Sequence, residues 1–269
     1  EGVPLSYCIL FFDTVVQSMV LKGLTLISFA SKNVIIYFNI PIIQPVHINN
    51  QRLQTMYNLP YHKEKNEQVI KEFIAKYPFA FLSGIDAENK PVATQVPVFI
   101  EEKEGKKILR GHIMKNTDHY KAFLHNENVL AVFTGHHTYV SGTWYSNPHT
   151  PSTWNFMSVH AKGIIRFLDE EGLIDVLRLT TLHFENHNKQ SATIFDNLPS
   201  DYTHRLMKAI VAFEIEIKEL DTVFKLSQDR DEKSYDNIMV QLKEQGESGR
   251  VIAAEMEKRT KEVFPDQKK

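Results

Sequence analysis

The stretch VAFEIEIK, residues 211–218, decides the fold class of this chain. Valine, phenylalanine and two isoleucines stand at alternate positions, with alanine, two glutamates and a lysine between them. Because the side chains of a β-strand point alternately to its two faces, this pattern predicts a strand with one buried and one wet face. Other stretches predict strands at 79–85, 91–100, 108–114, 128–134, 138–145, 154–168 and 222–228, the last pairing with 211–218.

Helical spacing of apolar residues marks most of the remaining chain. It predicts helices at 66–77, 117–124, 170–187, 201–210, 231–245 and 249–263. Strands and helices do not alternate regularly, which argues against a doubly wound parallel sheet. We therefore expect a mainly β protein with helical additions, of the α+β class, built on a β-barrel. Pro97 predicts an edge strand or a bulge, Gly163 a bend, and the charged segment 101–106 a hairpin loop.

The composition predicts a globular protein with an adequate core. Apolar residues make up 42% of the 269 residues and charged residues 24%. The formal net charge of -2 gives no electrostatic signature of binding to nucleic acid or to an anionic membrane. The single cysteine, Cys8, cannot form a disulfide within the chain, so we expect a cytoplasmic protein. The net charge leads us to expect no membrane contact.

Residues 1–55 differ from the rest of the chain. They are apolar and β-branched, without a steady period, and contain few charged residues. We favour translated upstream sequence with Met56 as the natural start, which divides the chain into a segment 1–55 and a functional domain 56–269. A genuine extension that packs or mediates assembly is the second interpretation. A membrane or secretory segment is the third, but polar residues such as Lys22, Lys32 and Asn33 interrupt the long apolar window that a spanning helix needs.

Catalytic and metal-binding motifs are missing from the sequence, so we assign no catalytic residue. There is no G-x-S-x-G elbow and no glycine-rich phosphate loop, and the only thiol lies in the first segment. His183 and His187 stand four apart on a predicted helix, a spacing that can bind a metal. No third ligand is marked, so two solvated histidines are the favoured interpretation. His136 and His137 are neighbours in extended chain, point apart, and are interpreted as structural.

A group of cations and donors surrounds the end of the strand predicted at 108–114. Arg110 and His112 share one face of that strand, and Lys115 and Asn116 follow at its end. The helix predicted to start at position 117 adds backbone N–H donors. These groups can hold a dianion such as phosphate, although a solvated strand end explains the same residues.

Aromatic and hydroxyl side chains gather in a second stretch. YVSGTWY at 139–145 and TWNF at 153–156 include both tryptophans of the chain, Trp144 and Trp154. Aromatic side chains beside small hydroxyl residues can line a pocket for a flat ring. They can equally belong to the interior of a barrel.

The same stretches resemble the PaiB-like branch of the FMN-binding split barrels. The resemblance covers nearly all of 56–269 and follows the order of the chain. It rests on MYNLP at 56–60, LRGH at 109–112, AVFTG at 131–135, YVS through WY at 139–145, TWN at 153–155, VHAKG at 159–163 and KLSQ at 225–228.

The resemblance implies a flavin-reductase-like split barrel that forms a homodimer with FMN pockets between the subunits. It implies that the phosphate is met by Arg110, His112, Lys115 and Asn116. The ring or ribityl chain would be lined by Ser141, Trp144, Tyr145, Thr153, Trp154 and Asn155. The pocket would be closed, from the partner subunit, by Lys225, Gln228 and Arg230. Asp229 departs from the asparagine expected there, and its carboxylate is unfavourable beside a phosphate unless it pairs with Arg230.

The resemblance also implies a negative transcriptional regulator that affects sporulation and degradative-enzyme genes. The alternatives are an FMN-dependent oxidoreductase of the pyridoxamine-phosphate-oxidase type, and a scaffold whose pocket is vestigial. No helix-turn-helix with a basic recognition helix is evident, and acidic side chains outnumber basic ones from Met56 onward. A DNA or regulatory protein partner would therefore need a local basic surface created by dimerisation.

Overall fold

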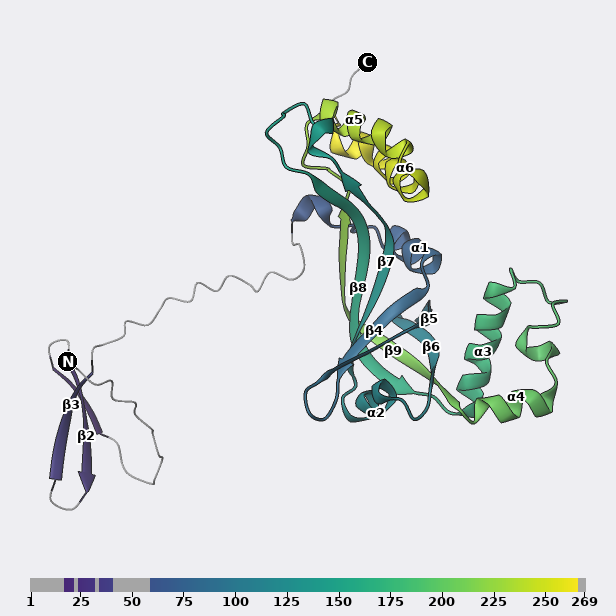
Figure 1. The fold of residues 1–269 in the computed structure, drawn as a ribbon. Coiled ribbons are helices and arrows are strands. Elements are labelled where there is room, and N and C mark those ends of the chain that lie inside the picture. The colour runs from purple at the N-terminus through teal and green to yellow at the C-terminus, as the bar shows by residue number, and fades with distance from the viewer. Residues whose placement is uncertain (1–16, 22–23, 32–33, 41–58, 266–269) are drawn as a thin grey trace, which may run out of the picture. The chain divides into compact units, whose positions relative to one another are not determined.

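The computed structural model describes residues 17–21, 24–31, 34–40 and 59–265 of the chain (Figure 1). The chain divides into two compact units, Glu1–Leu53 and Gln54–Lys269. In the first unit, β1 (Gln17–Leu21), β2 (Leu24–Ser31) and β3 (Val34–Ile40) form an antiparallel sheet in that order. Cys8 and the family-like opening at Met56 to Asn58 lie outside the described residues.

A closed antiparallel barrel forms the body of the second unit. Its strands follow the order β4-β5-β6-β9-β8-β7. Their bounds are β4 (Phe79–Ile85), β5 (Pro91–Lys103), β6 (Lys106–Met114), β7 (Asn128–Val140), β8 (Thr153–Phe167) and β9 (Ile210–Lys225). The barrel, with its added helices, confirms the predicted mainly β architecture of the α+β class.

Helices cover the ends and one side of this barrel. They are α1 (Glu67–Lys76), α2 (Asp118–His125), α3 (Glu170–Phe184), α4 (Ser200–Met207), α5 (Glu232–Lys243) and α6 (Gly246–Val263), with short 3-10 turns η1 (Pro60–His62), η2 (Gly142–Trp144) and η3 (Phe195–Asn197). Figure 1 shows α5 and α6 together at one end of β7 and β8, with α3 beside β6 and α4 near the start of β9. As predicted, Asn66 caps α1, because its side chain accepts the N–H groups of Gln68 and Val69. None of the described helices combines the length and the apolar character that crossing a membrane requires.

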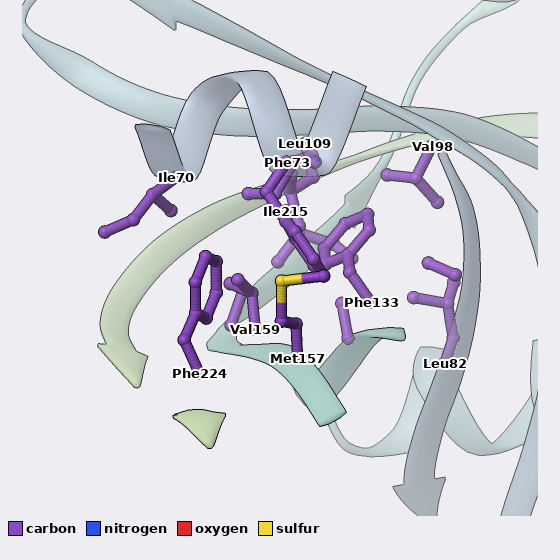
Figure 2. Packing of buried hydrophobic residues seen from close by; sticks show 14 of the residues in the cluster. Ile70, Phe73, Leu82, Val98, Leu109, Phe133, Met157, Val159, Ile215 and Phe224 are labelled. Atoms are coloured by element: carbon purple, nitrogen blue, oxygen red, sulfur yellow. The ribbon is translucent and has the colours of Figure 1, made fainter. Parts of the chain in front are cut away.

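The core fills the barrel interior and continues beneath α1, α5 and α6. Inward-facing side chains such as Leu109, Phe133 and Ile215 are fully buried. Figure 2 shows them gathered with Phe73 of α1 and Phe224 of β9, whose ring centroids lie 5.1 Å apart. Each such side chain contributes about 1.5–3 kcal/mol by leaving water, so the inward-facing strand residues and the buried faces of these helices stabilise the fold together.

Two pairs of predicted strands turn out to be single strands. The stretch 128–134 and the first part of 138–145 merge into β7, which ends at Val140 and whose pairing with β8 shifts register between Thr134 and His137. The stretch 211–218 and the first part of 222–228 merge into β9, which ends at Lys225, so the prediction that they pair with each other was wrong. A register shift at Lys162 and Gly163 accompanies the bend that Gly163 predicted. A bulge absorbs an extra residue without ending a strand, which is why local breaks in the pattern suggested two strands.

β5 starts at Pro91 as predicted, but the place of Pro97 and the end of the strand differ from the prediction. Pro97 is not on an edge strand, because β5 has β4 and β6 as neighbours. It lies where pairing with β4 ends, opposite Phe79, and just before pairing with β6 begins at Val98, so its missing N–H costs no ladder bond. The predicted loop 101–106 shrinks to a turn at Glu104 and Gly105, which both have positive φ (53° and 74°), as two-residue hairpins require.

Candidate functional site

Arg110 and His112 lie on the outer face of β6. Their neighbours Leu109 and Ile113 point into the core, so the intervening side chains face outward. Burial lowers the pKa of His112, which is therefore a neutral hydrogen-bonding group at pH 7. The predicted placement of these two residues on one strand face is confirmed.

Arg110 is largely enclosed but loosely paired. Its side chain is 20% exposed, and its Nη1 lies 3.4 Å from the carboxylate of Glu101. Phe99 stands opposite Arg110 in the pairing of β5 with β6, and the Phe99 ring packs 5.0 Å from that of His183 on α3. The buried Nε of Arg110 has no hydrogen-bond partner among the described residues. This guanidinium therefore retains an unused donor.

The end of β6 is less open to an anion than the sequence suggested. Lys115 and Asn116 form the turn before α2, and Asn116 has a positive φ of 62°. Two backbone N–H groups at the start of α2 already have partners, because Thr117 accepts that of Tyr120 and Asp118 accepts that of His119. The side chains of the turn, and not the helix start, remain available to a ligand.

A second cluster forms at the end of β9, around the segment 225–230, which we call the β9 turn. The Lys225 ammonium donates to the hydroxyl of Thr153 and, at 3.0 Å, to the carbonyl oxygen of Trp154. Burial lowers the pKa of Lys225, while nearby Asp229 opposes that shift. The cluster thus joins the start of β8 to the β9 turn.

Asn155 and Gln228 hold this turn in place. Asn155 is fully buried, and its Oδ1 accepts a hydrogen bond of 3.0 Å from Ser227. Ser227 itself has a positive φ of 63°, a conformation that costs energy for a residue with a side chain. Gln228 donates to the carbonyl of Phe224 at 2.5 Å. Their geometry gives both residues a positioning role, and a direct contact with a ligand stays a prediction.

Arg230 and Tyr145 form the polar wall of this cluster. The Arg230 guanidinium lies 4.9 Å from the centre of the Tyr145 ring, a cation-π contact. The carboxylate of Asp229 pairs with Arg230 at 3.4 Å. This pairing is the condition under which a carboxylate is tolerated beside a bound phosphate. Burial raises the pKa of Tyr145. The Tyr145 hydroxyl and Arg230 Nε are buried without hydrogen-bond partners among the described residues.

The predicted aromatic residues divide between core and surface. Trp144 packs against the main core, whereas Trp154 is 52% exposed on the outer face of β8, next to Tyr139 of β7. Ser141 caps η2 by accepting the N–H of Thr143. Among the residues predicted to line the pocket, Trp154 has a large ring surface open to a ligand.

The two clusters lie far apart within one chain. Arg110 pairs with Glu214 of β9, and Lys225 stands eleven residues further along the same strand. At about 3.3 Å per residue, these eleven residues span about 36 Å along the strand. A ligand of nucleotide size cannot touch both clusters of the same chain. The positions of the two groups of residues along the sequence do not reveal this distance, which depends on strand register.

Sequence reasoning missed His62, whose ring Nδ1 lies 3.0 Å from Oε1 of Gln228. The only sign of His62 in the sequence was its position two residues after the family-like segment 56–60. A cleft of about 830 Å³ runs between residues 60–66, α1 and α6, and among the predicted site residues only Gln228 lines it.

The described residues include no group of three potential metal ligands. His183 and His187 are 6.2 Å apart between ring centres, and His136 bonds Ser248.

The closed six-stranded barrel with its added helices places this chain in the class of mainly β barrel proteins. A family model described as "Putative FMN-binding domain" matches residues 56–219. The Bacillus subtilis "Protease synthase and sporulation protein PAI 2" is 30% identical over 207 residues, which cover 77% of this chain and 99% of that protein. This chain therefore belongs to the PaiB-like FMN-binding family.

More distant similarities accompany this match. An uncharacterized protein of Emericella nidulans is 24% identical over 238 residues, covering 74% of this chain and 95% of that protein. Among solved structures, the flavocytochrome Anf3 from Azotobacter vinelandii is 15% identical with a TM-score of 0.46, covering 65% of this chain and 75% of that one.

Proposed function

We propose that this protein is a cytoplasmic regulator that binds FMN in pockets shared by two copies of the chain. Family membership supports the ligand, and the name of the similar Bacillus protein, which refers to protease synthase and sporulation, supports a link to such genes. The negative sign of the regulation follows from the family resemblance. The proposal assigns the phosphate to the Arg110 cluster and the ring to the surface around Trp154.

One observation carries the proposal. Four buried side-chain polar atoms lack hydrogen-bond partners among the described residues, and three of them belong to Arg110, Tyr145 and Arg230. The fourth is the Tyr77 hydroxyl. Buried polar groups are normally paired, so unpaired ones mark places where a further partner is expected. A ligand with phosphate and ring oxygens supplies acceptors for such donors.

The distance between the clusters supports a homodimer. Since about 36 Å of strand separates them in one chain, a pocket that uses both must take one cluster from each of two chains. An exposed apolar face is available for that contact, because Phe79 is 60% and Phe81 is 42% exposed on β4. Trp154 is exposed on the same sheet and contacts the β9 turn through its carbonyl. The turn cluster therefore lies at the margin of this face.

The residues present suit FMN chemically. A guanidinium can hold phosphate oxygens in a two-pronged geometry, and Arg110 retains an unused Nε–H. Neutral His112 can add a hydrogen bond, and Lys115 adds a positive charge. The indole of Trp154 offers apolar contact to a flat ring. When bound, the flavin would supply any redox chemistry, and the chain would bind and orient it.

An FMN-dependent oxidoreductase is the second candidate. It is favoured by Lys225, a partly buried cation held beside the Trp154 backbone, where it could influence a bound ring. Oxidation of a reduced nicotinamide by the FMN-loaded protein separates the two candidates. Turnover would favour the enzyme, and binding without turnover would favour the regulator.

An FMN titration followed by fluorescence quenching tests the proposal. We expect saturable binding with one FMN per chain, two in each dimer. The absorbance spectrum of the loaded protein should also shift from that of free FMN. If binding does not saturate below about 100 μM, equivalent to about −5.5 kcal/mol, then FMN is not the ligand.

A further inference from the structure

The segment 59–66, which we call the strap, lies against the last part of β9. β6 accompanies β9 only as far as Glu216 in the pairing, so the remainder of β9 pairs with β8 alone among the described strands. The hydroxyl of Thr222 on β9 donates to the carbonyl of Glu64 at 2.9 Å, and Lys63 pairs with Asp221. The strap is thus fixed beside the strand that leads into the β9 turn.

His62 links this strap to the turn. Its ring is 1% exposed, although it lies in a short 3-10 turn at the surface of the barrel. Nδ1 of His62 is 3.0 Å from Oε1 of Gln228, 166 residues away in sequence. Burying an imidazole removes its hydrogen bonds to water, so this contact must satisfy the ring nitrogen.

The backbone fixes the direction of this hydrogen bond. Oε1 of Gln228 accepts the N–H of Leu226 at 2.7 Å, while Nε2 donates to the carbonyl of Phe224 at 2.5 Å. A flipped amide would set donor against donor and acceptor against acceptor, so the oxygen must face His62. His62 therefore donates through Nδ1–H.

Gln228 in turn fixes the residues on either side of it. Its amide bridges Phe224 and Leu226 across the end of β9, directly before Ser227 with its positive φ. The N–H of Arg230 closes the turn by donating to the carbonyl of Ser227 at 3.1 Å. The side chains of Lys225 and Arg230 project from this same turn. Its conformation decides where those two cations lie.

We infer that His62 is a positioning residue for the flavin site, holding the β9 turn through Gln228. This inference rests on the proposed FMN function. His62 lies outside the sequence stretches that carry the family resemblance. The inference therefore adds a new residue to the proposed site and gives the strap a role in supporting that site. The role is one of orientation, since His62 contacts the turn and not the proposed ligand.

Three variants separate this role from general loosening of the strap. His62→Ala removes the donor. His62→Asn keeps an N–H near the position of Nδ1. Lys63→Met breaks the neighbouring pair with Asp221 but leaves Gln228 untouched.

Hydrogen exchange of the ligand-free protein is the first readout, because it does not depend on FMN. We expect His62→Ala to speed exchange in a peptide covering 224–230, and His62→Asn and Lys63→Met to leave it near the wild-type rate. Equal exchange in all four proteins would overturn the inference, as would equal acceleration by His62→Ala and Lys63→Met.

FMN affinity is the second readout. His62→Ala should weaken binding roughly two- to tenfold, the equivalent of one neutral hydrogen bond, and His62→Asn should restore most of it. Unchanged affinity in His62→Ala, or no rescue by His62→Asn, contradicts the role of His62. Absence of FMN binding in the wild type contradicts the proposed function instead, and the exchange result then decides alone whether His62 holds the turn.

Discussion

Replacing Arg110 with alanine tests the assignment of the phosphate. In the free protein the Arg110 guanidinium forms one ion pair, at 3.4 Å, with the carboxylate of Glu101. Its buried Nε–H has no hydrogen-bond partner among the described residues. A phosphate therefore gains this donor without breaking a strong internal bond. Hydrogen bonds to charged groups contribute about 1.5–3 kcal/mol, so Arg110→Ala should raise the Kd for FMN about 12- to 140-fold. Arg110→Lys should also lose affinity, because an ammonium lacks the two-pronged geometry.

Arg166 provides a matched control for this substitution. Arg110 on β6 and Arg166 on β8 both pair with Glu214 of β9, one from each side. Arg166→Ala removes the same charge from an exposed position outside the proposed site. The assay is the FMN titration at low and high salt, with melting curves to confirm folding. Equal affinities of Arg110→Ala and wild type, or equal losses in both alanine variants, would refute the reasoning.

Three further outcomes follow from the same description. Trp154→Ala should weaken FMN binding with little salt dependence, since it removes apolar ring contact, and a loss confined to low salt would contradict this. Binding to DNA, measured by gel shift, should be weak and strongly salt-dependent, and a tight, sequence-specific shift at physiological salt would oppose that expectation. Burial lowers the pKa of His62, His112 and His160 below the usual 6.5, so the unfolded chain takes up protons first as pH falls. The melting temperature should therefore hold above about pH 6.5 and drop as the pH falls below that value, whereas a flat profile would mean that these rings are not buried in solution.

Alternation and capping made much of the fold predictable from the sequence. The period-two pattern of 211–218 and the bounds 79–85 both correspond to observed strands, and Asn66 caps α1 as expected. Bulges were not predictable, because the pattern at Thr134 to His137 looks locally like the end of a strand. Whether a strand continues past such a point depends on partners distant in sequence.

The strand faces of individual candidate residues could be predicted from the sequence, but the arrangement of these residues in space could not. Alternation correctly placed Arg110 and His112 on one face. The sequence could not show that Asn155 bonds to Ser227 of the β9 turn, or that Gln228 bonds to His62 of the strap, because these partners lie 72 and 166 residues away. The sequence also gave no sign that the Arg110 cluster and the β9 turn occupy distant parts of the barrel, since that separation depends on strand register.

Mixing two defective variants tests the shared pocket most directly. Arg110→Ala and Arg230→Ala chains, unfolded and refolded together in equal amounts, should form dimers of which half are mixed. If each pocket takes Arg110 from one chain and Arg230 from the other, one pocket of every mixed dimer is intact. Titration should then recover high-affinity FMN binding at about a quarter of the wild-type capacity, while each variant alone shows none. No recovery in a mixture that light scattering shows to be dimeric would mean that the two clusters do not share a pocket across subunits.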